Sequence, residues 1–122
     1  METLTQSQRA TLEAALRELA AELEASLAQS RDAAQPVDLE DPIGRVSRMD
    51  AMQQQSMARA SRHRATARLE RVQAALRRMK AGEYGDCLRC DEPIGFGRLA
   101  TAPEAATCVR CQSEIEASRS AG

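Results

Sequence analysis

The residues best suited to chemistry in this sequence are four cysteines, which form two close pairs. Cys87 and Cys90 enclose two residues, Cys108 and Cys111 enclose two more, and seventeen residues separate the pairs. Two C-x2-C pairs at this separation are typical of a four-cysteine zinc site, because each short turn can aim two thiolates at one tetrahedral ion. Four protein ligands leave no position for a catalytic water, so we expect one structural Zn²⁺.

The rest of the sequence indicates the compartment in which these thiols act. No run approaches the roughly 20 apolar residues that cross a bilayer, and the first residues lack the basic-then-apolar order of a secretion signal. We therefore expect no membrane association and a cytoplasmic location, where paired cysteines bind metal more often than they form disulfides. A thiol-based redox or zinc sensor is an alternative function that the same four cysteines allow.

The elements that must position the cysteines are helical. The chain has 122 residues, and its aromatic residues are Tyr84 and Phe96, both outside the first two thirds. A segment rich in Ala, Leu, Glu, Arg and Gln without aromatics is typical of long paired helices, which bury a narrow seam. We therefore predict a mainly α fold.

Leucine spacing predicts the first helix and its pairing face. Five leucines recur at intervals of three and four residues: Leu12, Leu16, Leu19, Leu23 and Leu27. This spacing places them on one side of a helix. A Ser or Thr between Thr5 and Ser7 can cap its start, and Pro36 disfavours helix at the residue before it.

A second helix is predicted from about residue 42 to Gly82, a residue type that commonly ends helices. Its seam is strong near the cysteines, where the residues are Leu69, Val72, Leu76 and Met79. Farther from the cysteines the seam positions hold Ala51, Ala58 and Ala65, so the outer half should pack more loosely.

We predict a long antiparallel helical hairpin, or coiled coil, over residues 1–81, with its tip at about 33–50. A four-cysteine zinc finger over 82–112 and a short C-terminal helix and tail over 113–122 complete the predicted order.

Charge is distributed unevenly along this hairpin. Residues 1–41 hold nine acidic and three basic side chains, whereas residues 59–80 hold eight basic side chains and Glu70. An acidic helix beside a basic one gains Coulomb energy that salt screens. The basic helix also leaves a zinc-finger nucleic-acid-binding module as an alternative function. We do not expect direct nucleic-acid binding, because the helices offer no aromatic platform for base stacking.

The residues around the cysteines carry a family resemblance. Gly82-Glu83-Tyr84-Gly85-Asp86 precede Cys87, the motifs Pro93-Ile94, Arg98-Leu99 and Pro103 lie between the pairs, and Gln112 follows Cys111. This pattern closely resembles the zinc-finger signature of the DksA/TraR family, also called DnaK suppressor proteins. The resemblance covers roughly residues 42–112.

The resemblance implies that the protein is a non-enzymatic transcription regulator that binds in the secondary channel of bacterial RNA polymerase. Members of the family often act together with ppGpp in the stringent response. The family's tip carries the pattern Asp-x-x-Asp-x-Ala; here Asp41 matches the first acid, while Gly44 and Val46 replace the second acid and the alanine. The resemblance implies that Asp41, Arg45 and Asp50 face the polymerase. The absence of a nucleophile with a base partner, of a glycine-rich phosphate loop and of an open metal site also argues against an enzyme.

Counting back from Cys87, the family's ppGpp-contacting positions fall on Arg64 and Arg71, which are one heptad apart on the second helix. A third basic position of the family falls on Gln112, which carries no charge. Asp91 stands where the family usually has glycine, a difference that matters if the backbone there needs a positive φ.

Overall fold

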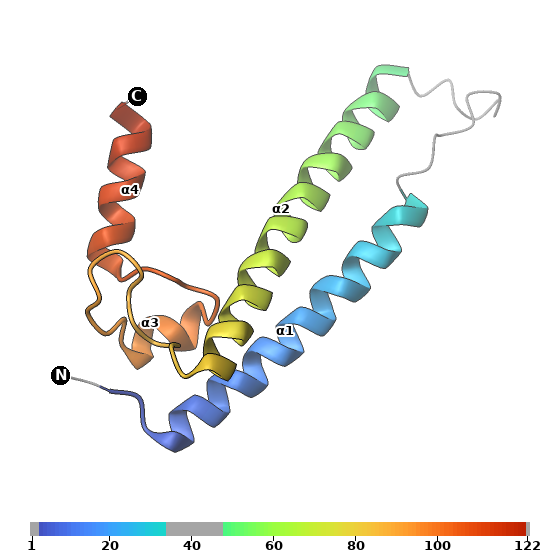
Figure 1. Cartoon of the computed structure of the whole chain (residues 1–122). Coiled ribbons are helices and arrows are strands. Elements are labelled where there is room, and N and C mark those ends of the chain that lie inside the picture. Colours follow the sequence, from blue (N-terminus) through green and yellow to red (C-terminus); the bar gives the residue numbers. More distant parts are fainter. Residues whose placement is uncertain (1–2, 34–47, 122) are drawn as a thin grey trace. The chain divides into compact units, whose positions relative to one another are not determined.

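The computed structural model describes residues 3–33 and 48–121, and these form a mainly helical fold. The elements in chain order are α1 (Gln6–Ala33), α2 (Arg48–Ala81), α3 (Phe96–Thr101) and α4 (Val109–Ala121) (Figure 1). One isolated antiparallel bridge pairs Asp86 with Pro93. The predicted mainly α class, with a long helical hairpin, a four-cysteine cluster and a short C-terminal helix, is confirmed.

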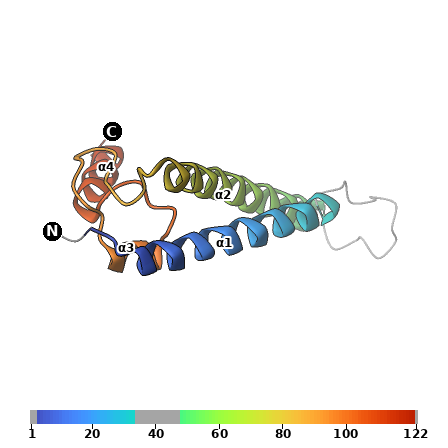
Figure 2. The same ribbon diagram turned by 60° about the horizontal axis from the view of Figure 1, so that its bottom comes forward.

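The chain divides into two compact units, and both long helices pass from one to the other. The first unit holds Met1–Ala20 and Glu70–Gly122, and the second holds Ala21–Leu69. Within each unit a segment of α1 runs beside a segment of α2 (Figure 2). The predicted connection between the helices, with Asp41 and Arg45, lies outside the described residues.

A small core fills the first unit. Leu12 and Leu16 of α1 are at most 2% exposed, and Val72 and Ala75 of α2 are fully buried. These side chains continue the leucine stripe and the seam that the sequence predicts. Leu99 of α3 is also fully buried. The core thus combines residues of the hairpin with one residue of the segment that carries the cysteines.

The second unit has no buried residue among its described positions, as its alanine-rich seam predicts. A polar contact joins its two helices instead. Nη1 of Arg62 on α2 donates to the carbonyl oxygen of Leu27 at 3.4 Å and to Oγ of Ser30 at 3.2 Å. Leucine and alanine side chains there leave a hollow of about 160 Å³ lined by Ser26, Leu27, Ser30, Ala58, Ser61, Arg62 and Ala65.

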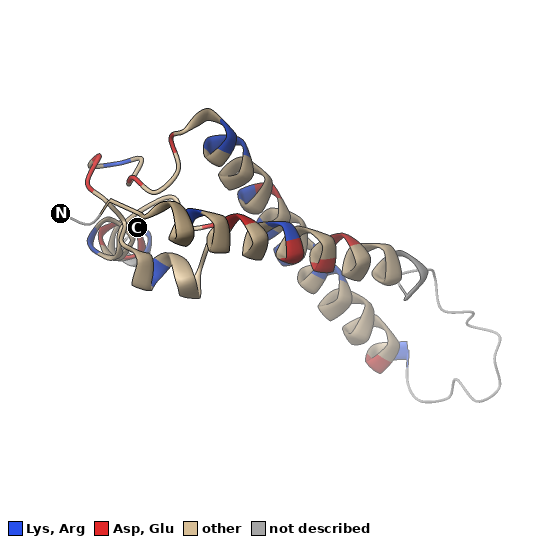
Figure 3. Ribbon diagram, turned by 90° about the horizontal axis from the view of Figure 1, so that it is seen from below, with Lys and Arg blue, Asp and Glu red and all other residues tan. Residues whose placement is uncertain are grey.

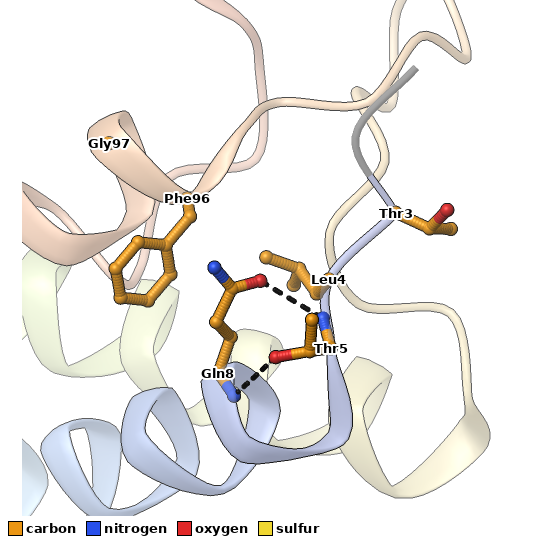
Figure 4. Close-up of a pocket in the computed structure, with 6 residues that line it drawn as sticks. All are labelled: Thr3, Leu4, Thr5, Gln8, Phe96 and Gly97. Atoms are coloured by element: carbon orange, nitrogen blue, oxygen red, sulfur yellow. Dashed lines mark hydrogen bonds between the residues drawn. The ribbon is translucent and has the colours of Figure 1, made fainter.

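The start of α1 and the end of α2, which lie in the first unit, are capped. At the start of α1, the Thr5 amide donates to Oε1 of Gln8 at 2.9 Å and the Gln8 amide donates to Oγ1 of Thr5 at 3.0 Å (Figure 4). This reciprocal pair is a capping box. At the end of α2, Gly82 has a φ of 76°, and the amides of Gly82 and Glu83 donate to the carbonyls of Met79 and Arg78. These two bonds form the Schellman stop that the glycine predicts.

Charged residues of both signs lie on each long helix, with more acidic than basic positions on α1 and mostly basic positions on α2 (Figure 3). The ion pair on α1 joins Arg17 Nη2 to Glu13 Oε1 at 2.9 Å within that helix. Both side chains are well exposed, so this pair contributes little to stability. None of the described helices combines the length and the apolar character that crossing a membrane requires.

Candidate zinc centre

The four cysteine sulfurs lie together as the spacing predicts. The Sγ atoms of Cys87, Cys90, Cys108 and Cys111 are all within 4.8 Å of one another, and none is in a disulfide. Cys90 Sγ and Cys108 Sγ are 3.8 Å apart. A tetrahedral Zn²⁺ with Zn–S bonds of about 2.3 Å places its sulfurs about 3.8 Å apart. The donor set therefore fits one structural zinc ion with no position left for water.

The first cysteine pair is held by a tight turn of backbone hydrogen bonds. The Cys87 amide donates to the carbonyl of Glu92 at 2.8 Å, and the Asp91 amide donates to the carbonyl of Cys87 at 2.9 Å. The Arg89 amide points at Cys87 Sγ at 3.4 Å, which suits a thiolate. Asp91 has a φ of 63°, so the position does adopt the left-handed conformation that glycine favours.

The second pair stands at the start of α4, which begins at Val109. The Cys111 amide donates to Cys108 Sγ at 3.5 Å, and the Gln112 amide donates to the Cys108 carbonyl at 2.9 Å. Amide groups in the first turn of a helix stabilise a neighbouring negative charge. This end of α4 therefore favours the thiolate of Cys108.

The ionisation of the cluster follows from these contacts. For Cys87, burial is the largest influence and raises the pKa, but backbone hydrogen bonds together outweigh it and bring the pKa to about 6. The pKa of Cys108 is lowered, first by the Cys111 amide. Burial and hydrogen bonds to the other cysteines raise the pKa of Cys111 to about 12. Zinc binding must therefore displace a proton from Cys111, because the metal ligand is the thiolate.

The cysteine charges also affect Arg110, which lies between Cys108 and Cys111. The pKa of Arg110 is raised, first by the charge of Cys90 and then by those of Cys111 and Cys108. The guanidinium thus offsets part of the negative charge of the thiolates.

The loop before Cys108 is fixed by contacts that the sequence did not predict. The Tyr84 hydroxyl donates to the carbonyl of Pro103 at 2.8 Å, and Arg98 Nε donates to the carbonyl of Thr107 at 2.8 Å. The Leu88 amide donates to the carbonyl of Ala106 at 2.9 Å. These three hydrogen bonds are difficult to predict from the sequence, because a single Arg or Tyr in a zinc finger can equally well be exposed to solvent.

Arg89 makes a further contact that spacing alone cannot reveal. Its Nη1 donates to the carbonyl of Cys111 at 3.0 Å and pairs with Glu114 Oε2 at 3.1 Å. The side chain therefore reaches from the first cysteine pair to α4.

Of the polymerase-facing and ppGpp-contacting positions that the resemblance implies, the structure describes Asp50, Arg64, Arg71 and Gln112. Asp50 lies in the first turn of α2 with an exposed side chain. Arg64 is exposed in the second unit, and Arg71 is exposed in the first, where it lines a hollow of about 580 Å³ with Arg98, Gln112 and Arg119. Gln112 uses both ends of its amide, accepting from Thr107 Oγ1 at 2.8 Å and donating to Glu116 Oε1 at 3.2 Å.

Comparison with known proteins assigns the finger. Residues 82–117 match the family described as the prokaryotic dksA/traR C4-type zinc finger. The RNA polymerase-binding transcription factor DksA of Caulobacter vibrioides is 40% identical over 48 residues, which are 39% of this chain and 34% of the relative. DksA of Buchnera aphidicola subsp. Schizaphis graminum is 29% identical over 76 residues, 62% of this chain and 48% of the relative. The matches thus span between a third and a half of these relatives.

The fold also has a solved counterpart. The structure of transcription factor DksA2 from Pseudomonas aeruginosa superposes with a TM-score of 0.71 at 26% identity, covering 93% of this chain and 87% of that one. The match extends well beyond the finger to the helices. With the cysteine geometry and the match over residues 82–117, it shows that this segment is a zinc finger of the dksA/traR C4 type in a chain whose fold resembles that of DksA2.

Proposed function

We propose that the chain is a DksA/TraR-like transcription regulator that binds bacterial RNA polymerase, with its helical hairpin directed into the secondary channel. The observation that carries this proposal is the combination of a four-cysteine finger with two long helices in a fold that matches DksA2 over 93% of the chain. Relatives named RNA polymerase-binding transcription factors support the choice of partner. A cytoplasmic location follows from that partner.

In this proposal zinc has a structural role. The cluster joins the turn after α2 to the start of α4, and Leu99, Tyr84 and Cys87 between them are nearly fully buried. A finger this small cannot bury enough apolar surface to fold alone, so metal binding supplies much of its folding free energy. The expectation that the chain is not an enzyme agrees with relatives that are transcription factors.

The finer part of the proposal assigns polymerase contacts to Asp41, Arg45 and Asp50. Alanine at each position should leave zinc content and helix content unchanged, while it weakens the effect of the protein on transcription. The test is the lifetime of promoter complexes formed by purified polymerase, with Gln53→Ala as a matched control on the exposed side of α2. An unchanged effect in all three variants would remove these residues from the site.

Contact with ppGpp is a separate part of the proposal and falls on Arg64 and Arg71. Support comes from the hollow beside Arg71, where Arg98 and Arg119 add positive charge that Glu104 and Glu116 offset in part. Gln112 adds none, and both ends of its amide already have partners. We therefore expect weak binding, which titration of labelled ppGpp into the complex with polymerase will measure. Arg71→Ala should abolish this binding, and Arg77→Ala, an exposed position on another side of α2, should not.

A further inference from the structure

The second unit has a charged residue at a position of α2 where apolar side chains usually pack. The half-buried positions that recur there every three or four residues are Ala51, Gln55, Ala58, Arg62, Ala65 and Leu69. Arg62 is the charged member of this set. Moving a guanidinium out of water costs free energy, so apolar packing gives no reason for an arginine at this position.

The contacts of Arg62 are with neutral oxygen atoms of α1. Its Nη1 donates to the Leu27 carbonyl at 3.4 Å and to Ser30 Oγ at 3.2 Å. Ser30 Oγ itself donates to the same carbonyl at 3.0 Å, so the three atoms form a closed triangle. No carboxylate in the described part of the chain pairs with Arg62. Because neutral acceptors replace the hydration of a guanidinium only in part, this contact adds more to the direction of the helix pair than to its stability.

The side chains around Arg62 do not fix how α2 is turned against α1. The seam positions Ala51, Ala58 and Ala65 stand seven residues apart, and a methyl group is too short to interlock with the leucines of α1. A hollow of about 160 Å³ remains beside Leu27 and the last two of these alanines. A planar guanidinium, in contrast, forms good hydrogen bonds in only a few directions. The two hydrogen bonds of Arg62 therefore depend on the rotation of α2 about its axis, whereas the alanine contacts hardly do.

We infer that Arg62 is a positioning residue, which sets the rotation of α2 against α1 in the second unit at a cost in stability. A single polar residue in the seam of a helix pair can select one arrangement in this way. The inference rests on the proposed function, because Asp50 and its exposed neighbours on this part of α2 face polymerase in that proposal. Without the arginine, the pair should stay folded but adopt several rotations.

The test compares Arg62→Leu with Arg62→Lys in the full-length, zinc-loaded protein. Leucine fills part of the hollow and removes the half-buried charge, so its Tm should equal or exceed that of the wild type. The amide resonances of residues 48–69 should nevertheless broaden or double in the NMR spectrum, because several rotations exchange. Lysine keeps a cationic donor and should restore a single set of resonances. Arg59→Leu, the same change at an exposed position of α2, is the matched control and should keep a single set and the wild-type Tm.

A second measurement connects this geometry with function. It is the protein concentration that gives half of the maximal effect on the lifetime of promoter complexes formed by purified polymerase. This concentration should rise about fivefold for Arg62→Leu, which corresponds to about 1 kcal/mol. It should return close to the wild-type value for Arg62→Lys.

The outcomes separate the two proposals. A single set of resonances in Arg62→Leu would overturn the positioning role, and so would a Tm below that of the wild type, because Arg62 would then act as an ordinary stabilising contact. A wild-type effect of Arg62→Leu on promoter complexes would overturn the role in function. If the wild-type protein itself has no effect on promoter complexes, the proposed function fails, while the NMR comparison still decides whether Arg62 sets the rotation of α2.

Discussion

The hydroxyl of Tyr84 donates a 2.8 Å hydrogen bond to the carbonyl oxygen of Pro103. Tyr84 stands two residues after the glycine that caps α2, and Pro103 lies in the loop between α3 and the third zinc ligand. The tyrosine is only 3% exposed. This contact therefore ties the end of the long helix to the segment that delivers Cys108.

The buried position of Tyr84 predicts an unusual titration. Burial raises its pKa to about 12; the charge of Arg78 opposes this shift and that of Glu104 adds to it. Because Tyr84 is the single tyrosine, the ultraviolet absorbance of tyrosinate reports this residue alone. The folded protein should titrate near pH 12, and the protein in guanidinium chloride should titrate near the ordinary value of about 10.

The raised pKa of Tyr84 also determines whether the protein becomes more or less stable as the pH rises. Between pH 10 and 12 the unfolded chain loses the Tyr84 proton while the folded chain keeps it, so the unfolded state binds fewer protons and stability falls as pH rises. The loss attributable to Tyr84 should reach about 2 to 3 kcal/mol. A folded-state midpoint close to 10 would contradict both expectations.

Metal analysis should find one zinc per chain, and zinc affinity should rise with pH through the neutral range. The reason is that Cys111, whose pKa is raised to about 12, must lose a proton to bind the metal. Cys111→Ser should lose the zinc and part of the helical circular dichroism signal, whereas the exposed Ser113→Ala should keep both. Full zinc occupancy in Cys111→Ser would exclude the four-thiolate site.

Gly85→Ala should destabilise the first unit. Gly85 has a φ of +107°, and a Cβ there would lie 3.1 Å from Leu4 Cδ1. The backbone strain alone costs on the order of 1 to 2 kcal/mol, and displacing Leu4 adds to it. Gly97→Ala is the control, because a Cβ at Gly97 meets nothing within 4 Å and the residue is helical. Thermal unfolding should show a lower Tm for Gly85→Ala and an equal or higher one for Gly97→Ala.

Asp91→Gly should stabilise the protein. Asp91 holds a φ of 63°, which glycine adopts without the steric penalty of a Cβ. The left-handed conformation costs an L-residue about 1 to 2 kcal/mol, and the chain entropy of glycine offsets about 0.5 to 1 kcal/mol of this. We therefore expect a gain of up to about 1 kcal/mol in the free energy of unfolding for Asp91→Gly, and a loss for Asp91→Ala. Denaturant titration of the zinc-loaded protein measures both. If the glycine variant is less stable than the wild type, the Asp91 side chain makes a contribution that its backbone angle does not explain.

Replacing a leucine by alanine should destabilise the protein more in the first unit than in the second. Leu16 is fully buried, so Leu16→Ala should cost about 2 to 5 kcal/mol. Leu27 lies on the same stripe but is only half-buried in the second unit, so Leu27→Ala should cost clearly less. Equal losses in denaturant titration would contradict the loose packing of the outer hairpin.

Patterns with a strong geometric basis could be predicted from the sequence. The cysteine spacing located the metal cluster, the leucine interval located the side of α1 that Leu12 and Leu16 bury, and Gly82 located the end of α2. The contacts of Arg62 and Arg89 could not be predicted. From the sequence alone, a long charged side chain is expected to be exposed to solvent. The fold brings the Leu27 carbonyl within reach of Arg62 and the Cys111 carbonyl within reach of Arg89. Asp41 and Arg45 stay predictions, because they lie outside the described residues.

The most direct test of the central claim is localised cleavage of the bound protein by an iron ion placed at the catalytic magnesium site of RNA polymerase. If the hairpin tip enters the secondary channel as proposed, the zinc-loaded chain will bind core polymerase and will be cut between about residues 41 and 50. Absence of binding, or binding without cleavage in this segment, would contradict it.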